Sequence, residues 1–173
     1  MPIATAHQTI GPYWHLLDDP TWADLLRFGA EGERISISGR ITDGDGAPVA
    51  DACVEIWQAD PPASDTFPGF GRAATDAEGV FRFVTLKPGA VAGRGNGVQA
   101  PHLAIAIFAR GLLRHLVTRL YFAGEPQNAI DPLLNAIEDE ARRATLIAQP
   151  DGPGRWRLDI SLQGAAETVF LDV

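Results

Sequence analysis

A two-residue alternation of apolar and polar side chains, repeated in short segments, constrains the fold of this chain more than any other feature. Ile35, Ile37 and Ile41 alternate with polar neighbours, which is typical of a strand that buries one face. Similar strand-like segments lie at residues 49–59, 80–86, 102–109, 113–122, 156–162 and 169–173. Glycine- and proline-rich turns lie between them. This pattern predicts an all-β fold, an antiparallel β-sandwich.

The first 33 residues lack this period and predict an extended N-terminal arm followed by a short helix. Gly11-Pro12 disfavours regular structure in the arm, and Pro20 fits the first turn of the short helix. Asp131-Pro132 is a typical N-cap and first-turn pair. We therefore expect one further helix near residues 131–147.

Composition excludes several classes of protein. The net charge of −8 argues against nucleic-acid and anionic-membrane partners, which both favour basic surfaces. Cys53 is the single cysteine, so no intrachain disulfide forms, and we expect it to be a small core residue. The chain has no signal-like segment and no apolar run near the roughly 20 residues that span a bilayer, so a cytoplasmic location is expected. We expect a single domain over residues 1–173, with the sandwich at 34–173.

The segment His102-Leu103-Ala104 resembles a metal-binding strand that lacks one ligand. Residues 102 and 104 point to the same side of a strand, so two histidines there could hold one metal ion, whereas Ala104 has no donor atom. From the residues alone, a hydrogen-bonded strand histidine is the favoured interpretation of His102, and a residual metal ligand is the alternative. The other histidines show no metal-ligand spacing: His7, His15 and His115.

Arg110 follows an apolar strand and precedes Gly111, a junction at which a guanidinium can be directed into a cleft. Arginine suits carboxylate ligands because its planar fork donates two parallel hydrogen bonds. An ordinary surface arginine is the other interpretation, and these residues alone favour it.

Six segments carry motifs that occur in the same order in one protein family. They are Gln8–Tyr13, Val54–Asp60, Phe70–Asp76, Leu86–Gly89, Ala100–His102 and Thr118–Phe122. Together with the ending Gln163–Phe170, they resemble the intradiol ring-cleaving dioxygenases over nearly the whole chain. Within that family the pattern is most similar to the iron-free alpha subunit of the two-subunit enzymes that act on protocatechuate (3,4-dihydroxybenzoate).

The resemblance implies a ferric site made of two tyrosinates and two histidines in the iron-bearing chains, a donor set that suits Fe(III). Here Val91 stands where one tyrosine is expected, and Ala104 stands in place of the second histidine. The loop at residues 60–70, where the other tyrosine would lie, contains none. Only His102 is retained. The resemblance therefore implies no metal site and no catalytic residue in this chain alone, with Fe(III) bound by a partner beta subunit.

The same resemblance assigns this chain to the wall of the partner's substrate pocket. Gly11, Pro12 and Tyr13 of the arm would line the pocket, Thr9 would add hydrogen bonds, and Arg110 would favour an anionic aromatic carboxylate. The implied reaction is O2-dependent cleavage of protocatechuate to 3-carboxy-cis,cis-muconate in aromatic-compound catabolism, by a higher oligomer of alpha–beta pairs. The loop between residues 60 and 70 is shorter than is common in the family, which leaves its interface contacts open.

Two other functions stay open at this level. Residues 37–49 also resemble the opening of transthyretin-like and carboxypeptidase-regulatory-like domains, which favours a non-catalytic β-sandwich binding or assembly module. That alternative leaves residues 8–13 and Arg110 unexplained. A stand-alone metalloenzyme with a rebuilt ligand set is the second alternative, and it would use His7, His15 or His115.

Overall fold

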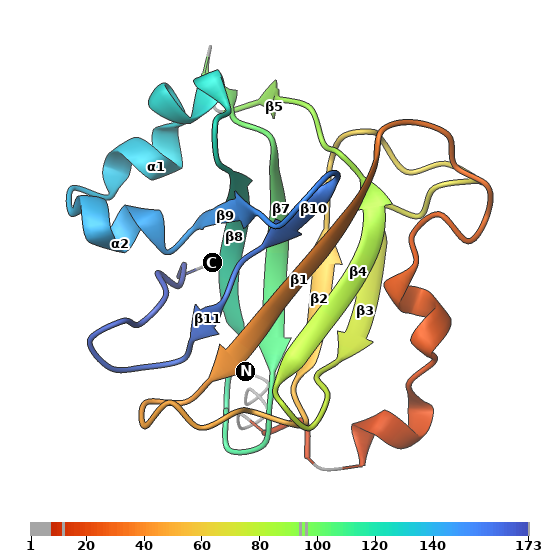
Figure 1. The fold of residues 1–173 in the computed structure, drawn as a ribbon, viewed down its shortest axis with the longest axis vertical. Coiled ribbons are helices and arrows are strands. Elements are labelled where there is room, and N and C mark those ends of the chain that lie inside the picture. Colours follow the sequence, from red (N-terminus) through yellow and green to blue (C-terminus); the bar gives the residue numbers. More distant parts are fainter. Residues whose placement is uncertain (1–7, 12, 94, 96, 173) are drawn as a thin grey trace, which may run out of the picture.

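The computed structural model describes residues 8–11, 13–93, 95 and 97–172, and strands dominate it (Figure 1). The strands are β1 Arg34–Thr42, β2 Cys53–Trp57, β3 Phe70–Ala74, β4 Val80–Leu86, β5 Val91–Ala92, β6 Val98–Gln99, β7 His102–Phe108, β8 Leu116–Phe122, β9 Ile147–Pro150, β10 Arg155–Arg157 and β11 Ile160–Ser161. The helices are the 3₁₀ turns Trp14–Leu17, Pro20–Ala23 and Pro126–Ala129, and α1 Pro132–Ala136 and α2 Glu140–Ala144. The all-β prediction is confirmed. Within the described residues, no helix is long and apolar enough to cross a membrane.

The main sheet is mixed, so the predicted purely antiparallel arrangement is not confirmed. β1 pairs antiparallel with β4, and β7 pairs antiparallel with both β2 and β8. However, β1 runs parallel to β10 and β11, and β8 runs parallel to β9. Parallel neighbours need a long crossover connection, and the segment with α1 and α2 provides one between β8 and β9. Because β9 also pairs with β10, it connects the two halves of the sheet.

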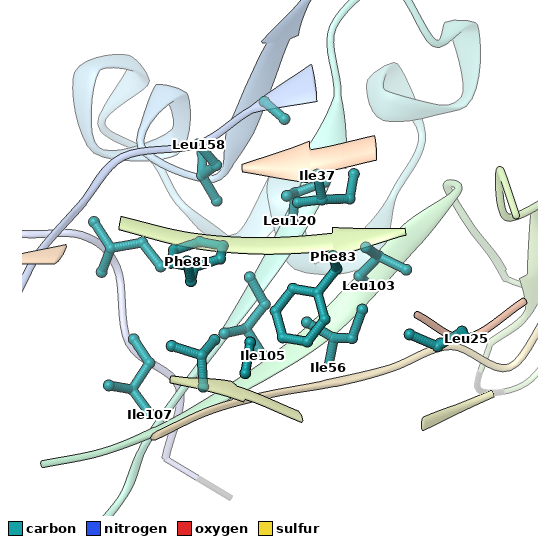
Figure 2. Packing of buried hydrophobic residues seen from close by; sticks show 14 of the residues in the cluster. Leu25, Ile37, Ile56, Phe81, Phe83, Leu103, Ile105, Ile107, Leu120 and Leu158 are labelled. Carbon is teal, nitrogen blue, oxygen red and sulfur yellow. The ribbon is translucent and has the colours of Figure 1, made fainter. Parts of the chain in front are cut away.

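The core lies between two layers of strands. β1 and β4 cross the face formed by β2, β3, β7 and β8 (Figure 1), and large apolar side chains fill the space between them (Figure 2). These side chains come from alternate positions of the strands: Ile35, Ile37, Ile41, Val54, Ile56, Phe81, Phe83, Leu103, Ile105, Ile107 and Leu120. Each such burial contributes roughly 1.5–3 kcal/mol. The inward faces predicted from the period are therefore confirmed.

The helix expected near residues 131–147 is instead two short helices. Each has its own N-cap, because Asp131 accepts hydrogen bonds from the amides of Leu133 and Leu134, and Asp139 does the same for α2. The predicted N-cap at Asp131 is therefore confirmed, but the single continuous helix is wrong. A second capping residue inside the segment starts a new helix there.

The predicted terminal strand at residues 169–173 is also wrong for its described part. One bridge, from Leu171 to Val117, is present there. Val169 instead bonds to side chains: its carbonyl accepts from the Thr118 hydroxyl, and its amide donates to the Thr145 hydroxyl. These side-chain hydrogen bonds take the backbone groups that a strand ladder would need.

Candidate functional site

Strand β7 connects two regions that the sequence motifs single out. His102 is its first residue, and Arg110 lies two residues beyond its last residue, Phe108. From residue 102 to residue 108 the strand advances about 20 Å, at 3.3 Å per residue. We call residues 8–11, 13, 14, 51 and 109–111 the arm site. We call Gln99, Ala100, His102, Ala104, Arg119, Tyr121 and Asp131 the His102 network.

In the arm site, Thr9 ties the N-terminal arm to the backbone on both sides of Arg110. The Thr9 hydroxyl donates to the Ala109 carbonyl over 3.0 Å and accepts from the Gly111 amide over 3.1 Å. Gly111 has a φ of +84°, a left-handed conformation that glycine adopts without the steric cost of a side chain. The arm and the end of β7, about 100 residues apart in sequence, therefore form one structural unit.

Asp51 is the second anchor of the arm site. Its carboxylate Oδ2 forms an ion pair with Nε of Arg110, and its backbone carbonyl accepts a hydrogen bond from Trp14 Nε1 over 3.1 Å. Asp51 thus holds both Arg110 and the arm. Sequence reasoning missed this residue, because it belongs to none of the recognised motifs. The pairing of β2 with β7, which sets Cys53 opposite Phe108, is what brings it to Arg110.

Most of the predicted pocket residues lie together in this region. Thr9 contacts the residues on both sides of Arg110, and Gly11 and Tyr13 lie in the arm between Thr9 and Trp14, which bonds to Asp51. Pro12 lies outside the described residues. Tyr13 is 73% exposed, and the Arg110 side chain is 62% exposed. Both side chains are therefore accessible to a molecule that approaches from outside this chain.

A hollow of about 240 Å³ lies between the arm and the outer face of the sheet. It is lined by Ile10, Trp14, Cys53, Glu55, Arg72 and Phe108. Arg72 Nη2 and Glu55 Oε1 form an ion pair of 2.5 Å. The predicted burial of Cys53 is confirmed, although it lies beneath the arm and not in the cluster between the two layers of strands. Burial raises the pKa of its thiol to about 12. That thiol stays protonated at neutral pH and is a poor nucleophile.

At the other end of β7, the His102 network is closed by internal hydrogen bonds. His102 Nδ1 lies 2.7 Å from the Ala100 carbonyl, and the imidazole packs against Tyr121 with ring centroids 5.4 Å apart. The Tyr121 hydroxyl donates to Asp131 Oδ1 over 3.1 Å. Arg119 Nη1 donates to Gln99 Oε1 over 2.8 Å and to the Tyr121 hydroxyl over 3.1 Å. The favoured interpretation of His102 as a hydrogen-bonded strand histidine agrees with this geometry.

The electrostatics of the His102 network favour neutral rings beside a fixed cation. Burial raises the pKa of Tyr121 to about 12, so its phenol remains protonated at neutral pH. Burial also lowers the pKa of His102 below its usual value, and the positive charge of Arg119 adds to this effect. Arg119 pairs directly with Ala104 across β7 and β8. A guanidinium therefore lies beside residue 104, the position at which the resemblance predicts a second histidine in the iron-bearing chains.

The donors at this end of β7 do not fit a ferric ion. Val91, in β5, offers an alkyl side chain, and Ala104 offers a methyl group. The Asp131 carboxylate is occupied by four hydrogen bonds, from Tyr121, Ala100, Leu133 and Leu134. Among the described residues, no group of three or more His, Cys, Asp or Glu side chains could hold a metal ion. His102 alone, next to Arg119, is insufficient for a trivalent cation.

The other two described histidines, His15 and His115, form no metal-ligand group with His102. His115 stacks on Phe108 at a centroid distance of 5.1 Å, near the arm site. His15 is exposed, and His7 lies outside the described residues. The rebuilt ligand set of a stand-alone metalloenzyme therefore finds no support in the described part of the chain.

The fold and the motifs define a class of enzyme. A family model described as Dioxygenase (Dioxygenase_C) matches residues 17–164. The chain therefore belongs to the intradiol dioxygenase family, which consists of iron-dependent oxidoreductases. The match includes the segment that resembles transthyretin-like domains and extends far beyond it on both sides.

Relatives within that family are more specific. The chain is 41% identical over 192 residues to the protocatechuate 3,4-dioxygenase alpha chain of Pseudomonas putida, covering 97% of this chain and 96% of the relative. It is 39% identical to the alpha chain of Burkholderia cepacia, covering 98% and 97%. Identity to the protocatechuate 3,4-dioxygenase beta chain of B. cepacia is 37%, over 82% of this chain and 64% of that one.

Solved structures agree with this assignment. The dioxygenase domain of a dioxygenase carbohydrate-binding protein fusion from Streptomyces sp. SirexAA-E superposes with a TM-score of 0.65 at 28% identity, covering 95% of this chain and 98% of that domain. Catechol 1,2-dioxygenase from Pseudomonas arvilla C-1 gives 0.63 at 23% identity, covering 82% and 56%. The second match supports the fold alone.

Proposed function

We propose that this chain is the iron-free alpha subunit of a protocatechuate 3,4-dioxygenase and that it acts with an iron-bearing beta subunit. The complex would cleave protocatechuate between its two hydroxylated carbons, with O2, to give 3-carboxy-cis,cis-muconate. The observation that carries the proposal is the contrast along β7. Among the described residues, the His102 end offers no group of three or more His, Cys, Asp or Glu side chains for a metal ion, and it holds the Arg119 cation. The arm site, in contrast, presents accessible groups suited to a substrate wall.

Iron in the beta subunit would bind and activate the dihydroxylated ring, and the arm site would supply the surrounding wall. Arg110 is suited to the substrate carboxylate because it is exposed and can donate two parallel hydrogen bonds. Gly11, Pro12 and Tyr13 would shape a slot for the flat ring, and Thr9 would hold the arm in place through its two hydrogen bonds.

Exposed apolar side chains near the arm site support a partner surface. They are Tyr13, Leu16 and Leu113, each more than 60% exposed. A contiguous group of such side chains on a protein surface can mark a protein interface. We propose that the beta subunit covers them, and that alpha–beta pairs form a higher oligomer. A cytoplasmic location and a single domain over residues 1–173 remain predictions.

Reconstitution tests this function. The chain is co-expressed with the beta subunit of a close relative, and the purified complex is assayed for loss of protocatechuate and uptake of O2. We expect ring cleavage by the complex, a red-brown ferric–tyrosinate colour, and no cleavage by this chain alone. Cleavage by this chain alone at the rate of the complex would refute the proposal.

A further inference from the structure

Asp51 has a position that the proposed substrate wall does not explain. Its carboxylate meets Arg110 at Nε, the nitrogen nearest to the backbone. Its carbonyl also receives the Trp14 indole of the arm over 3.1 Å. A single residue therefore connects the cationic group of the arm site to the arm itself.

The contact at Nε leaves part of the guanidinium available. A guanidinium has a side edge that includes Nε and an end edge formed by its two terminal nitrogens. Within the described residues, the Arg110 contact with Asp51 is at Nε, while 62% of the side chain remains exposed. The end edge is the one that can bind a carboxylate through two parallel hydrogen bonds. Asp51 therefore restrains Arg110 at Nε, while most of the side chain stays accessible to a ligand.

The backbone around Arg110 is restrained as well. Thr9 bonds to residues 109 and 111 on either side of it, so the Cα of Arg110 is fixed relative to the arm. A free arginine side chain loses rotamer entropy when it is ordered. Asp51 orders this side chain in advance, which lowers the cost of binding a carboxylate.

We propose that Asp51 is the positioning residue that makes Arg110 selective for aromatic carboxylates. The proposal rests on the proposed function, since it concerns the substrate of the same site. Asp51 acts through Arg110 in two ways: it fixes the direction of the guanidinium, and its negative charge limits the attraction of Arg110 for other anions. The direction of the guanidinium, and not its charge alone, then determines which substrates Arg110 binds.

Two substitutions separate geometry from charge in the co-expressed complex. Asp51→Ala removes both the acceptor and the charge, whereas Asp51→Asn keeps an oxygen that can accept from Nε. We expect Asp51→Ala to raise KM for protocatechuate about tenfold, with kcat and with KM for uncharged 4-methylcatechol changed less than about twofold. We expect Asp51→Asn to keep KM for protocatechuate within about twofold of the unmodified complex, or below it.

A double-mutant cycle with Arg110→Ala shows whether Asp51 acts through Arg110. In the Arg110→Ala background, Asp51→Ala should have no further effect on protocatechuate. Inhibition constants of 4-hydroxybenzoate and phenol provide the same comparison without turnover. Glu167→Ala is the matched control, because Glu167 also pairs with an arginine, Arg142, at 3.5 Å, but lies outside the arm site.

The outcomes are distinct. Three results would each overturn the positioning role. They are equal losses of affinity for charged and uncharged ligands, equal effects of Asp51→Ala and Asp51→Asn, and a full effect of Asp51→Ala in the Arg110→Ala background. An unmodified complex that does not cleave protocatechuate would instead refute the proposed function. The expected selective loss in Asp51→Ala, absent from Glu167→Ala, supports both.

Discussion

The two ends of β7 differ in where their polar groups find partners. At the His102 end, Arg119 donates to Gln99 and Tyr121, and Asp131 accepts from Tyr121 and from the Ala100 amide. At the Arg110 end, the guanidinium has one carboxylate partner and remains mostly exposed. A hydrogen-bonded network of buried side chains stabilises a fold, whereas an ordered but accessible cation can bind a ligand. The difference indicates that structural and binding roles are divided between the ends of a single strand.

The largest expected effect tests whether the His102 end is structural. Asp131 is fully buried and accepts four hydrogen bonds. Replacing it with alanine leaves those donors unpaired, so Asp131→Ala should lower the free energy of unfolding by about 3 kcal/mol. Urea denaturation followed by circular dichroism measures this loss. The control is Asp139→Ala, which removes the exposed cap of α2 and should cost about 1 kcal/mol. Similar losses in both variants would contradict the structural role.

The next effect tests whether the Arg110 end binds ligand. Arg110→Ala removes a cation suited to the substrate carboxylate, so kcat/KM for protocatechuate should fall about 10- to 100-fold, equivalent to roughly 1.5–3 kcal/mol. Iron content of the complex should not change, because the arm site holds no ligand of the metal. Steady-state kinetics and metal analysis of the same preparation provide both values. Loss of iron in parallel with activity would show that the role assigned to Arg110 is wrong.

A smaller effect concerns the arm. Thr9→Val keeps the size of the side chain but removes the hydrogen bonds to Ala109 and Gly111. A neutral hydrogen bond contributes about 1 kcal/mol, so kcat/KM should fall about three- to tenfold for charged and uncharged catechols alike. Thr66→Val, on an exposed loop, is the control and should leave kcat/KM unchanged. A loss confined to carboxylated substrates would instead show that Thr9 acts by holding Arg110 and not by holding the arm.

The smallest effect is a pH dependence at the His102 end. Burial lowers the pKa of His102 in the folded chain, while in the unfolded chain it is about 6.5. Below that pH the unfolded chain binds the proton more readily, so this contribution to stability is lost as pH falls from about 7 towards 5. His102→Gln should reduce that loss. Urea denaturation midpoints of the unmodified chain and of His102→Gln at pH 7, 6 and 5 measure this loss of stability. Midpoints that fall in parallel in both proteins would refute the assignment of the loss to His102.

Local features were predictable from the sequence, and long-range contacts were not. The buried faces of β1, β4 and β7 follow from period two, and the Asp131 N-cap follows from the Asp-Pro pair. The parallel pairing of β8 with β9 depends on a crossover whose direction no local pattern encodes. The contact of Asp51 with Arg110 joins residues far apart in the chain and needs the β2–β7 register. The sequence identifies Arg119 only as a strand residue, because its position opposite Ala104 depends on the register of β7 with β8.

Metal analysis tests the division of labour along β7 most directly. The chain is purified alone and as the complex with its beta subunit, both are incubated with iron and desalted, and bound iron is measured. We expect about one iron per alpha–beta pair in the complex and a negligible amount in this chain alone. Stoichiometric iron in this chain alone would contradict the assignment of the ferric site to the beta subunit.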